Sequence, residues 1–118
     1  MRKFTEILCL ILVLLSLSIG NGLARWIQAG GAIDGEADGD GSGRAVAISA
    51  DGTITAIGTR YNDGNGSNSG HVRVFQYQSG TWVQLGSDID GLAPGDDFGT
   101  SLSLSADGLT LAIGAHRR

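Results

Sequence analysis

The sequence predicts an all-β protein that forms part of a β-propeller, with four-stranded antiparallel blades and a repeat of 56 residues. The first observation is internal similarity, because residues 99–114 repeat residues 43–58. In the wider alignment of residues 26–62 with residues 82–118, 17 of the 37 positions are identical. The second observation is that strand-type alternation recurs while no segment shows helical periodicity. A fixed offset of this kind indicates a repeat architecture.

Each copy is predicted to be a β-hairpin. Residues 45–49 and 101–105 alternate bulky with small side chains, which is the pattern of a strand. Ala-Asp-Gly follows in both copies, and this glycine supplies the positive φ that a tight turn requires. Residues 53–57 and 109–113 then carry apolar side chains on both faces, which predicts strands buried on both sides.

Further strands complete the repeat. They are predicted at residues 71–77 and 81–85, and residues 26–30 are predicted to form a strand equivalent to the second of these. Four strands per period make a propeller blade, and a blade must stack on neighbours because it cannot bury both apolar faces alone. Residues 25–118 are therefore expected to hold about one and a half blades of a truncated propeller.

The N-terminal residues 1–24 predict a signal peptide. Arg2 and Lys3 precede an apolar core at residues 7–19, and small residues lead to a cleavage site after Ala24. A membrane anchor through residues 7–24 is the alternative, although this core is shorter than the roughly 20 residues that span a bilayer. The expected location is therefore secreted or cell-surface, with a membrane contact only if the segment is uncleaved.

The composition of the mature part excludes several classes of function. Cys9 is the only cysteine and lies in the predicted signal peptide, so a disulfide framework and cysteine-ligated zinc are excluded after cleavage. From Arg25 onward the chain has six Arg and eleven acidic residues. This acidic balance argues against nucleic-acid binding, which depends on basic patches.

The second copy resembles the FG-GAP repeat, which builds the N-terminal β-propeller of integrin α subunits and related extracellular proteins. Phe98-Gly99 matches the opening Phe-Gly, and Ile113-Gly114-Ala115 matches the Gly-Ala element, with His116 in place of the following proline. The first copy departs further, with Ser42-Gly43 at the opening position. Gly70-His71-Val72-Arg73-Val74-Phe75 is similar to the strand that follows in the family.

The resemblance does not bring the family's calcium site with it. Calcium-binding members carry an Asp-x-Asp-x-Asp-Gly loop between the first two strands of a blade. Here that place holds only one acid in each copy, Asp51 and Asp107. One carboxylate does not supply the six to eight oxygens that calcium takes.

An alternating acidic loop is the candidate metal site, and calcium the candidate ion. The residues are Asp34, Glu36, Asp38 and Asp40. They begin like a calcium loop, but Ala45 occupies the position where a bidentate acid is expected. The alternative is a solvated connection without an ion. No other cofactor is expected.

Two further motifs carry weaker signals. Asn65-Gly66-Ser67 is an N-glycosylation sequon, which would be used only in a eukaryotic host. His71 and His116 are the only histidines, and no nucleophile motif accompanies them, so no catalytic residue is predicted.

The expected function is a non-enzymatic binding or adhesion module outside the cell or on its surface. The resemblance implies an extracellular protein or glycan partner. The alternative is a propeller scaffold of a larger secreted enzyme, whose catalytic part lies outside this chain. Fold alone does not decide between the two.

Overall fold

A computed structural model describes residues 25–117, so the predicted signal peptide at residues 1–24 lies outside the described residues. The described part is all-β and contains no helix, as the sequence predicts. It also contains no helix long and apolar enough to cross a membrane. The strands are β1 (Ser42–Ile48), β2 (Ile54–Thr59), β3 (His71–Gln78), β4 (Thr81–Gln84), β5 (Ile89–Asp90), β6 (Phe98–Leu104) and β7 (Leu111–Ala115).

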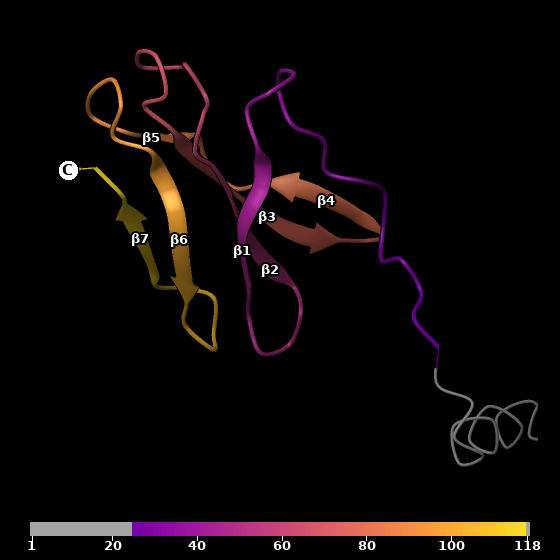
Figure 1. Cartoon of the computed structure of the whole chain (residues 1–118). Coiled ribbons are helices and arrows are strands. Elements are labelled where there is room, and N and C mark those ends of the chain that lie inside the picture. The colour runs from indigo at the N-terminus through magenta and orange to yellow at the C-terminus, as the bar shows by residue number, and fades with distance from the viewer. Residues whose placement is uncertain (1–24, 118) are drawn as a thin grey trace, which may run out of the picture.

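Strands β1 to β4 form an antiparallel meander, the arrangement predicted for one blade (Figure 1). Each strand pairs with the next one along the chain. The short strand β5 continues along the edge of β3 that β4 occupies, because β2 already pairs with the opposite edge. The core of this sheet consists of apolar side chains on β2 and β3, namely Ile54, Ala56, Ile57, Val72 and Phe75.

The hairpin β6–β7 repeats the geometry of β1–β2. Ser42 pairs with Thr59, and 56 residues later Phe98 pairs with Ala115; the other four registered pairs correspond in the same way. Both hairpins have an irregular register after the first pair, where Gly43 and Gly99 have φ of 85° and 87°. The two halves of the predicted repeat therefore share one backbone conformation.

The second hairpin packs against the first blade, with its tight turn at the same end (Figure 1). The backbones approach so closely that a Cβ atom on Gly58 would collide with the carbonyl oxygen of Gly99. At the turns, the backbone N–H of Ala50 donates to the carbonyl oxygen of Ala106 over 2.9 Å. This is the stacking of one sheet on the next that a propeller requires.

The predicted strand at residues 26–30 is wrong. This segment has no strand pairing, and Trp26 is fully exposed. Its counterpart Trp82 lies in β4, where β3 provides the partner strand and Tyr77 the ring contact. The positions that would supply the same partner to Trp26 fall inside residues 1–24, which lie outside the described residues.

Candidate functional site

A buried histidine at the start of β3 lies at the centre of a group of ionisable side chains. His71 is only 1% exposed. Its Nδ1 atom lies 3.6 Å from Asp88 Oδ2, 3.9 Å from Glu36 Oε1 and 3.9 Å from Asp90 Oδ1. The imidazole forms no hydrogen bond with the described residues, and its Nε2 atom is buried without a partner.

The carboxylates reach His71 from two different segments. Asp90 pairs with His71 across β3 and β5, so the ladder itself sets its position. Asp88 lies just before β5, and its Oδ1 atom accepts a hydrogen bond of 2.7 Å from Gln84 Nε2. This bond directs the other carboxylate oxygen of Asp88 toward His71. Glu36 comes from the loop that precedes β1.

Asn62 organises the same region from the loop between β2 and β3. Its buried side chain donates from Nδ2 to Asp40 Oδ2 over 3.0 Å and to Glu36 Oε1 over 3.4 Å. Its Oδ1 atom accepts from the backbone N–H of Gly64 over 2.8 Å. Hydrogen bonds of a buried amide fix the position of the groups that it bonds. Asn62 therefore holds the loop before β1 against the rest of the blade.

The four acids of the predicted calcium loop do not lie together. Glu36 joins the His71 group, and Asp40 is buried against Asn62. Asp34 and Asp38 are exposed, and the main-chain oxygen of Asp34 accepts a 2.7 Å hydrogen bond from the Arg73 guanidinium. Among the described residues, the group of three or more potential metal ligands is instead Glu36, His71 and Asp88, whose donor atoms lie within 4.8 Å of one another.

Sequence reasoning missed His71, Asp88 and Asp90 as site residues. Their spacing matches no metal motif, because they belong to a strand and to a connection that the sheet brings together. The alternating Asp-Ile-Asp at residues 88–90 was the available signal, since it places both acids on the same face of a strand.

Asn65 lies on an exposed loop, as a glycosylation acceptor should. Its Nδ2 atom, to which a glycan would be attached, donates a hydrogen bond of 2.8 Å to the carbonyl oxygen of Gly91. Use of the sequon would therefore replace a contact between this loop and the chain after β5.

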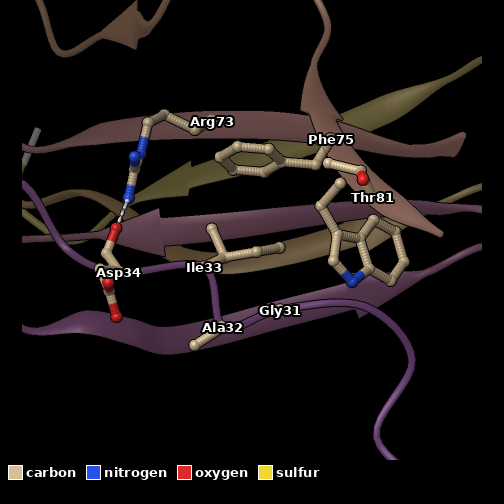
Figure 2. Close-up of a pocket in the computed structure, with 8 residues that line it drawn as sticks. Gly31, Ala32, Ile33, Asp34, Arg73, Phe75 and Thr81 are labelled. Carbon is tan, nitrogen blue, oxygen red and sulfur yellow. Dashed lines mark hydrogen bonds between the residues drawn. The ribbon is translucent and has the colours of Figure 1, made fainter.

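A groove of about 250 Å³ lies between residues 31–34 and the strands β3 and β4. Figure 2 shows Ile33 and Phe75 along it, with Arg73 reaching Asp34 at one end. The indole of Trp82 also lines it, packed against Tyr77 with ring centroids 5.1 Å apart, and its Nε1 atom donates to the Ala29 carbonyl oxygen over 2.8 Å. The groove therefore combines aromatic surface with one guanidinium.

The two turn aspartates have structural roles. The backbone N–H of Thr53, the Thr53 hydroxyl and the Ser49 hydroxyl all donate to Asp51 and lower the pKa of its carboxyl group. The backbone N–H of Leu109 and then the Ser105 hydroxyl lower the pKa of Asp107 in the same way.

Comparison with protein families matches residues 32–75 to the FG-GAP repeat. This span runs from the loop before β1 to Phe75 in β3, and it forms the consecutive antiparallel strands described above. The match to the FG-GAP repeat covers less than half of the chain. Comparisons with curated proteins and with solved structures gave no significant match.

The FG-GAP match falls on the copy whose short motifs are the weaker of the two. That copy opens with Ser42-Gly43, whereas Phe98-Gly99 opens the other, and among the described residues β3 follows the hairpin of the first copy. The matched span therefore contains strands from β1 into β3 but no Phe-Gly dipeptide.

Proposed function

We propose that this chain is part of an extracellular or cell-surface FG-GAP propeller that binds a protein or glycan partner and has no catalytic activity of its own. The observation that carries the proposal is the FG-GAP match over residues 32–75, which coincides with strands β1 to β3 of the blade. The signal-peptide pattern of residues 1–24 supports export.

The groove beside β3 and β4 is the proposed place of contact with the partner. Aromatic rings and a guanidinium are the groups that dominate protein and sugar recognition, because they offer large contact areas with directional polar groups. A volume of about 250 Å³ lies just below the range of small-molecule pockets. It suits one sugar unit or one side chain of a larger partner.

Binding of the full chain to arrays of immobilised glycans and extracellular proteins tests the proposal. We expect Trp82→Ala to weaken binding to any retained partner by at least about tenfold, because the indole lines the groove. Trp26→Ala is the matched control, since this tryptophan is fully exposed and lies outside the groove lining. Equal losses for both variants would contradict the proposed contact.

Export is tested separately by fusing a reporter to the C-terminus. The proposal expects the reporter outside the cell on a chain that begins at Arg25. Retention of the reporter in the cytoplasm would contradict the extracellular role. A longer natural form with a catalytic domain would favour the alternative of an enzyme scaffold.

A further inference from the structure

We propose that Glu36, His71 and Asp88 bind a divalent transition-metal ion of the zinc type. The three donor atoms lie within 4.8 Å of one another, and His71 Nδ1 is 3.6 Å and 3.9 Å from the two carboxylate oxygens. Bonds of about 2.0–2.2 Å to one tetrahedral ion place neighbouring donor atoms about 3.3 Å apart. The group therefore needs only small side-chain movements to close on an ion.

The charge balance of the group calls for a cation. Three carboxylates, those of Glu36, Asp88 and Asp90, surround one buried imidazole nitrogen. Even a protonated imidazole supplies a single positive charge against three negative ones. The three carboxylates are partly exposed, at 44%, 30% and 44%, and a divalent ion would offset their negative charge more fully than the histidine does.

The buried histidine is the observation that distinguishes this group from an ordinary acidic patch. Its side chain is 1% exposed, forms no hydrogen bond with the described residues, and has Nδ1 aimed at the carboxylates. A buried polar side chain without a hydrogen-bond partner lowers the stability of the fold. A metal bound at Nδ1 would give that nitrogen a direct bond, whereas the buried Nε2 atom would still have no partner among the described residues.

The surrounding side chains already orient two of the ligands. Gln84 Nε2 donates to the far oxygen of Asp88 over 2.7 Å, and Asn62 Nδ2 donates to Glu36 over 3.4 Å. Hydrogen bonds of this kind to metal ligands fix the carboxylates and tune affinity. The site is therefore built into the blade rather than assembled from free surface chains.

The donor set selects the type of metal. Calcium takes six to eight oxygen ligands, whereas imidazole nitrogen suits zinc and its neighbours in the transition series. A bound ion would join three segments, namely the loop before β1, the start of β3 and the connection that leads from β4 to β6. Its expected effect is to fasten the blade to the chain that enters the next one.

The test is calorimetric titration of the metal-free full chain with zinc chloride. We expect one zinc ion per chain, and we expect Glu36→Gln and Asp88→Asn to weaken binding at least about tenfold. Both side chains are partly exposed, at 44% and 30%, so these variants should keep the fold. Asp38→Asn is the matched control, because it removes one exposed acid from the same loop.

Two further experiments test the site, one with histidine variants and one with the melting temperature. His71→Gln should abolish zinc binding, whereas His116→Gln should leave it unchanged because that exposed histidine lies outside the group. Zinc should also raise the melting temperature of the wild-type chain, and calcium chloride should neither do so nor displace zinc. If the His71 variant does not fold, the two carboxylate variants decide the outcome.

Three results would overturn the site. They are the absence of zinc binding by the wild-type chain, an equal loss for Asp38→Asn and Glu36→Gln, and displacement of zinc by calcium at similar concentration. The outcome is independent of the binding partner proposed above, because the probe is the metal ion alone.

Discussion

The hairpins β1–β2 and β6–β7 have the same backbone and different surroundings. Their registered pairs correspond residue for residue, including the irregularity after the first pair, and their turn glycines Gly52 and Gly108 have φ of 77° and 75°. Yet five of the six residues of β2 are buried, whereas no residue of β7 is. Local sequence therefore sets the hairpin conformation, and the neighbouring sheet sets its burial.

The difference arises from what covers each second strand. Strand β2 is paired on both edges, by β1 and β3, and β6 packs on its face. Strand β7 pairs only with β6 among the described residues. Equivalent substitutions in the two hairpins should therefore have unequal effects, and the predictions below compare them in matched pairs.

The largest expected effect is at the closest approach of the two hairpins. Gly58→Ala should lower the free energy of unfolding by about 3 kcal/mol, because its Cβ atom would collide with the Gly99 main chain. The equivalent Gly114→Ala should cost under about 1 kcal/mol, since its new atom would collide with the exposed Ser101 hydroxyl, which can rotate away, and would meet the Ser101 main chain at an ordinary contact distance. Urea denaturation measures both, and equal costs would contradict the packing.

A smaller effect is expected at the serines that precede the turns. The Ser49 hydroxyl accepts a hydrogen bond of 3.0 Å from the N–H of buried Ile54. Ser49→Ala should therefore cost about 1–2 kcal/mol, because it leaves that donor unsatisfied. Ser105 accepts the same bond from Thr110 at an exposed position, so Ser105→Ala should cost about 0.5 kcal/mol. Urea denaturation measures both variants, and a larger loss of unfolding free energy for Ser105→Ala than for Ser49→Ala would contradict this prediction.

The turn aspartates predict a modest loss of stability in acid. The folded pKa values of Asp51 and Asp107 lie below the ordinary value of 3.8, so the stabilisation is present above that pH and is lost as the pH falls through the folded values. The urea midpoint should therefore fall in acid, and Asp51→Asn should reduce this fall more than Asp107→Asn does. Asp51 accepts the additional hydroxyl bond from Thr53. A pH dependence that neither variant changes would contradict these contacts.

The smallest effect is expected at Leu109, which follows the second turn and is 81% exposed. Leu109→Ser should change the free energy of unfolding by less than about 0.5 kcal/mol. Its repeat equivalent Thr53 bonds Asp51 and should be the more sensitive position. If Leu109→Ser lowered the free energy of unfolding more than Ser49→Ala does, the side chain of Leu109 would have to be buried, which would contradict its exposed position in the structure.

The sequence alone predicts the hairpins well, because their alternation, turn residues and repeat offset are local. The sequence-based prediction fails at residues 26–30, which have the side-chain pattern of a strand but no strand pairing in the structure. It also fails to identify the group around His71, whose members come from a loop, a strand and a connection far apart along the chain. Strand patterns reveal which face is apolar, but not which segments the sheet will bring together.

The most direct test of the account is the nuclear Overhauser contact between the α-protons of Gly58 and Gly99 in the folded full chain. The account predicts this contact together with matching cross-strand contacts for Val46 with Ile57 and for Leu102 with Ile113. Cross-strand contacts in both hairpins without any contact between Gly58 and Gly99 would show two separate hairpins, and would contradict the stacking of one blade on the next.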